Sequence, residues 1–141
     1  MGVYGVPKKS RVLIVPCSGM GKALGSVGRE AAYQVVEELR PDVSDTVCLS
    51  LLTMGDPEAQ ELVRTCPTIT IDGCAKACAF KNVQSTGVEP AADFQVADTF
   101  REHRDLKVRQ VIDVGEPGRE LARHVADKVA QAVDGIIGAG D

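Results

Sequence analysis

The sequence predicts an α/β protein of three layers, in which a mostly parallel sheet carries helices on both faces. Short β-branched runs alternate along the chain with segments of helical periodicity, and this alternation is typical of parallel sheets. The first run is uniformly apolar, as expected for a strand that is buried on both faces. The 141 residues suit a single domain over 1–141, and a chain of this length buries roughly 70% of its unfolded surface. The chain therefore needs no metal or disulfide merely to stay folded.

In the first half of the chain, apolar patterns and helix-start signals predict five elements after a loose leader over 1–10. The strand runs are short and rich in β-branched residues, whereas Leu24, Val27 and Ala31 recur at helical spacing. Asp56-Pro57 is a typical helix start, with an N-cap aspartate followed by proline. In order, we expect a strand over 11–16, a helix over 24–40, a strand over 46–52, a helix over 57–64 and a strand over 68–72.

The second half begins with a helix that we expect to start at Cys74 and to stop before Gly87. Residues 88–105 give the weakest pattern, with a candidate strand over 94–97 and a helical turn over 99–105. A further strand is predicted over 108–114, and Glu116-Pro117 opens a last helix whose apolar stripe reaches Ile136. We expect residues 136–141 to fray.

Composition and charge exclude several classes of function. The net charge of -4 and an aromatic content of 4% argue against a nucleic-acid partner. The longest apolar runs fall far short of the ~20 residues that a membrane helix needs. Five cysteines are an odd number for a disulfide framework, and the apolar run at Val12–Val15 is too short for a signal peptide. We therefore expect a cytoplasmic protein whose thiols bind metal or carry out redox chemistry.

The cysteines suggest a site at the carboxyl edge of the sheet, where ligands of parallel sheets usually bind. Cys17 directly follows the first predicted strand, and Cys74 follows the third after one glycine. On a helix that starts at Cys74, Cys78 would share its face, with roughly 5–6 Å between the two Cβ atoms. Two thiolates bind one zinc ion at ~2.3 Å each, and a helix N-terminus favours the thiolate form. Gly19 and Gly21 would let backbone amides approach the bound ion.

The two remaining cysteines are different cases. Cys48 lies inside the predicted strand 46–52, where a lone cysteine is either a small core residue or a ligand. Cys66 precedes the third strand, at the edge opposite Cys74, so we expect a buried core residue. Of the only two histidines, His103 is expected to be solvated, and His124 is expected to lie at the surface or at the boundary of the core.

The stretch Asp72-Gly73-Cys74, followed by Cys78-Ala79 and Lys81, resembles the signature of the DGC-domain family, whose members are regarded as zinc-binding proteins. The family also has Cys-Ser-Gly after its first strand, matched by Cys17-Ser18-Gly19, and a cysteine in the region of its second strand, matched by Cys48. The likeness covers residues 11–87, with Ala75 in place of the usual proline. It implies metal binding, most simply of zinc, by Cys17, Cys48, Cys74 and Cys78, and it implies no established reaction.

Several functions stay open on the sequence alone. Four thiolates would close the zinc site, whereas three would leave a position for water, a thiol or a substrate. A transferase or redox enzyme could act through Cys17, Cys74 and Cys78, although three residues separate the last two and redox pairs usually have two between them. An iron–sulfur cluster is the alternative cofactor, since four cysteines suit either.

Overall fold

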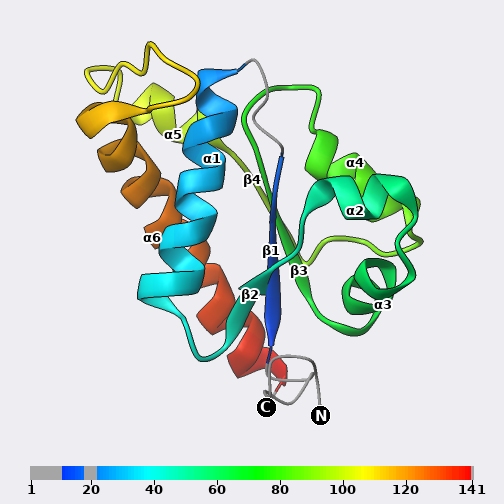
Figure 1. Cartoon of the computed structure of the whole chain (residues 1–141). Coiled ribbons are helices and arrows are strands. Elements are labelled where there is room, and N and C mark those ends of the chain that lie inside the picture. The colour runs from blue at the N-terminus through cyan, green and yellow to red at the C-terminus, as the bar shows by residue number, and fades with distance from the viewer. Residues whose placement is uncertain (1–10, 18–21, 141) are drawn as a thin grey trace.

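The strands of the sheet run parallel in the order β2-β1-β3-β4. A computed structural model of the chain describes residues 11–17 and 22–140. The strands are β1 (Val12–Pro16), β2 (Ser44–Thr46), β3 (Thr68–Asp72) and β4 (Ala92–Gln95). The carboxyl end of β1 lies at the top of Figure 1. The predicted parallel α/β sheet is confirmed, and two of its strands, β1 and β3, have nearly the bounds that the sequence predicts.

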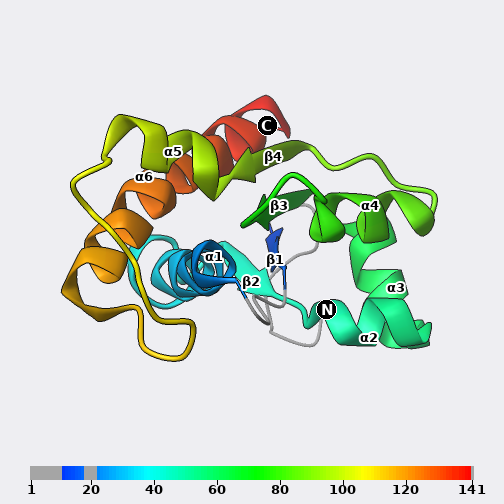
Figure 2. The ribbon, with the colours of Figure 1, turned by 90° about the horizontal axis from the view of Figure 1, so that it is seen from above.

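Helices cover both faces of the sheet, as the three-layer prediction requires (Figure 1, Figure 2). The helices on one face are α1 (Ala23–Gln34), its continuation η2 (Val35–Leu39), α5 (Val96–Glu102) and α6 (Gly115–Gly140). The helices on the other face are α2 (Leu49–Met54), α3 (Pro57–Thr65) and α4 (Cys78–Ser85).

The central strand β1 shows why both faces must be covered. Its side chains alternate between the faces: Val12 and Ile14 join the core beneath α1 and α6, and Leu13 and Val15 join the core beneath α2 to α4. All four are fully buried. A strand buried on both faces has no reason to alternate polar with apolar residues, which explains its uniformly apolar sequence.

The strand order places a topological switch point between β1 and β3. The chain leaves β1 through α1 to reach β2 on one side, and it returns through α2 and α3 to β3 on the other side. Connections that depart in opposite directions leave a crevice outside the carboxyl ends of the two central strands, where such sheets bind ligands. The fold therefore singles out the ends of β1 and β3 as the place for a site.

Two helix boundaries follow the local chemistry that the sequence indicates. At Asp56 the side chain accepts a hydrogen bond of 2.9 Å from the backbone N–H of Ala59, which caps α3. The first helix ends as a π-helix, in which the N–H of Arg40 donates to the carbonyl of Val35 at 2.8 Å.

The predicted strand over 46–52 is wrong over most of its length. Strand β2 ends at Thr46, and α2 begins at Leu49. Leu49 and Leu52 are buried while Leu51 and Met54 are exposed, which is the spacing of a helix lying on a sheet. A short apolar run fits both kinds of element, and here the helix buries the leucines better.

Downstream of β3 the predictions are partly wrong. The strand expected over 94–97 is β4, two residues earlier, and the turn expected over 99–105 is α5, three residues earlier. Residues 108–114 form no strand. Val108 and Val114 pack instead on the core between α1 and α6, and the carbonyl of Val111 accepts a hydrogen bond from the Ser26 hydroxyl. This segment is held by side chains, so it needs no neighbouring strand.

The last helix is longer than its apolar stripe predicts, because α6 continues to Gly140 where we expected the chain to fray. It packs against α1 and its continuation η2 (Figure 1). None of the described helices, α6 included, combines the length and the apolar sequence that a bilayer crossing requires. The predicted leader over 1–10 lies outside the described residues.

Candidate metal centre

Each of the first three strands delivers a cysteine just beyond its carboxyl end. Cys17 is the first residue after β1, Cys48 is the second after β2, and Cys74 is the second after β3. The backbone N–H of Cys17 donates to the carbonyl of Ile71 at 2.9 Å, which holds Cys17 beside the carboxyl end of β3. Because the strands are parallel, the three cysteines leave the sheet at the same edge, as predicted for Cys17 and Cys74.

Cys48 lies at the start of a helix and not in a strand. It is the N-cap residue of α2 and its side chain is exposed, so it is no core residue. Burial raises the pKa of the Cys48 thiol, but backbone hydrogen bonds from Ser50 and Leu51 and a side-chain hydrogen bond from Ser50 outweigh it and lower the pKa below its ordinary value. A thiol in this setting is accessible and ionises readily.

The helix that we expected to begin at Cys74 begins four residues later, at Cys78. Cys74 lies in a turn, and the carbonyl of Cys74 accepts a hydrogen bond of 3.1 Å from the N–H of Ala77. Ala77 itself adopts a left-handed conformation, with φ at 52°. Cys74 and Cys78 therefore do not share a helical face, and a tight turn sets the separation of the two thiols.

Asp72 explains why the helix starts late. This last residue of β3 is 3% exposed, and its carboxylate accepts hydrogen bonds from the backbone N–H groups of Ala79 (2.8 Å) and Phe80 (3.1 Å). It therefore caps α4 from the end of the strand. Burial raises the pKa of the Asp72 carboxyl above its ordinary value, and the two hydrogen bonds only partly oppose this. Sequence reasoning missed this role because ordinary capping signals link residues three apart, whereas Asp72 and Ala79 are seven apart.

Gly73 lies where two elements touch backbone to backbone. A Cβ on this residue would lie 2.3 Å from the backbone nitrogen of Gly25 and 2.5 Å from its Cα, in the first turn of α1. Only a residue without a side chain fits there. Gly73 thus holds the beginning of the Cys74 turn against the helix that follows Cys17.

The other candidate residues lie elsewhere. Cys66 is 4% exposed in the core beneath α2 to α4, and it precedes β3, so the prediction of a buried residue at the opposite edge is confirmed. His103 and His124 are half-buried and stack on one another between α5 and α6, with ring centroids 3.8 Å apart. Their contact was not predicted, because the two histidines lie far apart in the sequence, one at the end of α5 and the other within α6. Ser18, Gly19 and Gly21 lie outside the described residues.

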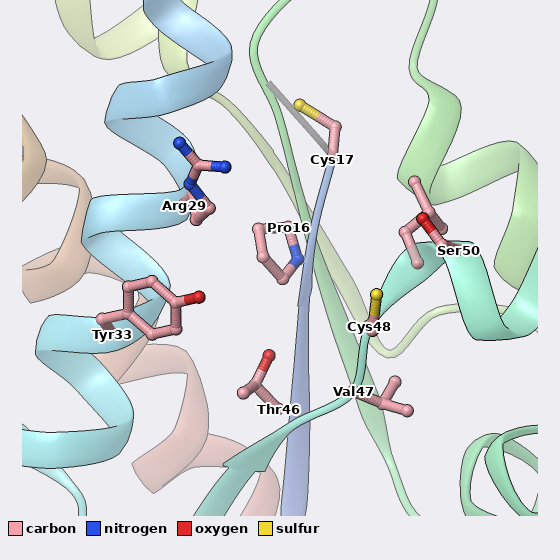
Figure 3. Close-up of a pocket in the computed structure, with 9 residues that line it drawn as sticks. Pro16, Cys17, Arg29, Tyr33, Thr46, Val47, Cys48 and Ser50 are labelled. Carbon is pink, nitrogen blue, oxygen red and sulfur yellow. The ribbon is translucent and has the colours of Figure 1, made fainter. Parts of the chain in front are cut away.

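A cavity of about 370 Å³ lies beside this edge, and Cys17 and Cys48 both line it (Figure 3). Arg29 and Tyr33 extend from α1 into the same space. They are four residues apart and hence on one face of the helix. Sequence reasoning missed both, because neither lies near a cysteine in the sequence.

Comparison with family models adds the identity of the domain. The model of the family described as DGC domain matches residues 13–133. The chain belongs to the DGC domain family. This membership confirms the resemblance carried by Asp72, Gly73 and Cys74, and it supports a metal-binding role for the protein. Neither the curated proteins nor the solved structures provide a match.

The donor set of this DGC domain suits a thiophilic metal. None of the five cysteines, all within the described residues, is in a disulfide, and thiolate sulfur is the donor that zinc and iron–sulfur clusters prefer. Cys48 and Cys78 are exposed, and Cys17 and Cys74 are half-buried, so all four sulfurs are accessible to an ion. Within the part of the chain that the structure describes, however, no three Cys, His, Asp or Glu side chains converge closely enough to hold one ion. The residues fit the metal in chemistry, and their side chains are not arranged around it.

Proposed function

We propose that this DGC domain binds one zinc ion through the thiolates of Cys17, Cys48, Cys74 and Cys78, in a reducing cytoplasm. The observation that supports this proposal is the delivery of a cysteine beyond the carboxyl end of each of β1, β2 and β3. Cys66 is the counterexample within the same chain, since it lies at the other edge and is buried.

Closing the four sulfurs around an ion requires movement that the local structure permits. Cys48 and Cys78 are exposed and free to change rotamer, and Cys74 lies in a turn between Gly73 and Ala77. Asp72 and Gly73 would hold the base of that turn while its tip adjusts. Metal binding would then order the rim of the sheet, because the ion would link three connections that the sheet itself does not join.

Cys48 decides which kind of zinc site forms. Four thiolates would give a closed site of charge -2 that serves structure, storage or sensing. Without Cys48, the ion would keep one open position, where a thiol or another small ligand could bind and react. The exposure of Cys48 at the start of α2 favours its use as a ligand.

Metal content of the full chain, purified without added metal, tests the proposal. We expect one zinc per chain by elemental analysis in the wild type. Cys17→Ser, Cys48→Ser, Cys74→Ser and Cys78→Ser should each lose it. Cys66→Ser is the matched control, because it makes the same chemical change at a buried sulfur, and it should keep its zinc.

Other outcomes would redirect the proposal. Loss at Cys17, Cys74 and Cys78 with retention in Cys48→Ser would indicate an open, three-ligand site. A brown protein that contains iron would indicate an iron–sulfur cluster. Metal-free protein in which Cys74 and Cys78 pair reversibly under mild oxidation would replace zinc binding by a thiol redox function.

A further inference from the structure

The cavity of about 370 Å³ next to Cys17 and Cys48 has a structural origin in the short edge strand. Strand β2 pairs with only the first three residues of β1 and ends at Thr46, opposite Ile14. Beyond that point the chain turns away toward α2, so the last part of β1 has no strand beside it on this side. The space between α1, the end of β1 and the segment that leads into α2 is the cavity (Figure 3).

Pro16 prevents the sheet from continuing into this space. The N–H of Val12 donates toward the β2 side, to Val43, whereas the N–H groups of Leu13 and Cys17 donate toward β3. This alternation assigns the nitrogen of Pro16 to the β2 side, where it has no hydrogen to donate. A ladder could not extend past Ile14, and no unsatisfied backbone donor of Pro16 is left in the cavity wall.

The lining combines one cation with apolar walls. Among the lining residues that the structure describes, Arg29 alone is charged. Tyr33 lies one helical turn further along α1, and 44% of its surface is exposed. Pro16, Val47 and Leu49 supply apolar surface. A guanidinium presents a planar fork that matches the two oxygens of a carboxylate or phosphate.

We propose that this cavity binds a small organic anion, a carboxylate or a phosphate monoester with a short apolar body, through the guanidinium of Arg29 and the hydroxyl of Tyr33. Its volume lies at the lower end of the range for small-molecule sites, which fits a metabolite of modest size and excludes a folded partner. Because Cys17 and Cys48 lie on the same cavity, the bound anion would contact both thiols. The inference does not depend on zinc, since neither Arg29 nor Tyr33 is among the proposed zinc ligands.

The amino-acid composition supplies a selective reporter for this site. The chain has no tryptophan and only two tyrosines, so Tyr4→Phe leaves Tyr33 as the single fluorescent side chain of its kind. The full-length Tyr4→Phe protein would be titrated with hexanoate, with hexyl phosphate and with neutral 1-hexanol, none of which absorbs where tyrosine does. We expect saturable changes in Tyr33 emission with at least one of the two anions and much weaker binding of 1-hexanol. The stronger anion identifies the source as a carboxylate or a phosphate ester.

Arg29→Gln in the same background should weaken binding of that anion at least about tenfold, as expected for the loss of a charge-assisted, two-pronged contact. Arg29→Lys keeps the positive charge but not the planar fork, so it should lose less affinity for the anion than Arg29→Gln does. The lysine variant also tests the contact if Arg29→Gln folds poorly. Arg64→Gln is the matched control, because Arg64 is an exposed arginine of α3 that does not line the cavity.

A second readout locates the ligand. In chelator-treated full-length protein, saturating anion should slow alkylation of Cys48 by iodoacetamide and leave Cys78 unchanged, since both thiols are exposed and only Cys48 lines the cavity. Equal binding of hexanoate, hexyl phosphate and 1-hexanol would overturn the proposal, as would unchanged affinity in Arg29→Gln. Zinc content is measured on the same samples, so failure here and failure of the zinc proposal are distinguishable.

Discussion

The two edges of the sheet are stabilised by different interactions. At the amino edge, charged side chains connect the elements: Arg11 contacts Asp45 at 2.6 Å, and Arg40 contacts Asp134 at 2.7 Å. At the carboxyl edge, contacts to backbone atoms have this role: Gly73 lies close to the backbone of Gly25, and the carboxylate of Asp72 accepts hydrogen bonds from two backbone N–H groups of α4. The difference teaches that ion pairs between side chains connect the elements at the amino edge, whereas contacts to the backbone do so at the carboxyl edge and leave its thiols accessible.

The largest effect should come from Gly73→Ala. The new methyl group would overlap backbone atoms of Gly25, which cannot rotate away, so we expect a loss of about 3 kcal/mol in the free energy of unfolding. Urea denaturation monitored by circular dichroism measures it. Gly135→Ala is the control, because nothing lies within 4 Å of that site on α6, and it should stabilise the protein by up to about 1 kcal/mol. Equal effects of Gly73→Ala and Gly135→Ala on the free energy of unfolding would mean that the close approach of Gly73 to Gly25 does not stabilise the carboxyl edge.

A smaller loss is expected for Asp72→Asn, of about 1–2 kcal/mol near neutral pH, because an amide presents only one acceptor to the two N–H groups of α4. Asp56→Asn makes the same change at the half-buried cap of α3, where asparagine is nearly as good an N-cap, and should cost a few tenths of a kcal/mol.

The pH dependence of the Asp72→Asn effect has a definite sign. Burial raises the pKa of Asp72 in the folded protein above its ordinary value of 3.8, so the folded state binds this proton more tightly than the unfolded state. The stability that this proton contributes is fully present below 3.8 and is lost as the pH rises through the raised folded value. The advantage of the wild type over Asp72→Asn should therefore grow as the pH falls from about 7 toward 4. An advantage that shrinks over this range would mean that Asp72 is not desolvated.

At the amino edge, Asp134→Asn should have the smallest effect, about 0.5 kcal/mol, because both partners are partly exposed and water screens their interaction. The hydrogen bond from Arg40 lowers the pKa of Asp134, so this contribution is present above the ordinary value of 3.8 and is lost as the pH falls through the lowered one. It should also weaken at 1 M salt, at which the Debye length is about 3 Å. Asp127→Asn is a control on the same helix, and a larger loss for Asp134→Asn than for Gly73→Ala would reverse the comparison of the edges.

The sequence predicted the parts of the fold in which one signal dominates. Strands β1 and β3 are β-branched runs with clear ends, and α3 has an N-cap aspartate followed by proline, so their bounds were nearly correct. The run at 46–52 failed because its leucines satisfy both helical and extended patterns, and only packing on the sheet selects the helix. Residues 108–114 failed because Ser26, distant in sequence, holds the segment as a loop.

The candidate site was predictable as far as topology determines it. The placement of Cys17 and Cys74 at one edge, and of Cys66 at the other, follows from strand direction alone. The start of α4 was not predictable, because its cap comes from Asp72 across an intervening turn. The cavity residues Arg29 and Tyr33 were not predictable either, because they reach Cys17 and Cys48 only after α1 has packed on the sheet.

The proline at the end of β1 has a consequence beyond the cavity that it borders. A bare strand margin with regularly spaced donors invites a strand from another chain, which is how sheets grow into aggregates. On this side of β1, three residues already pair with β2, and the next backbone nitrogen that faces the same way is that of Pro16, which cannot donate. An incoming strand therefore cannot continue the ladder at this point. The opening that admits a small ligand is thereby closed to polymerisation.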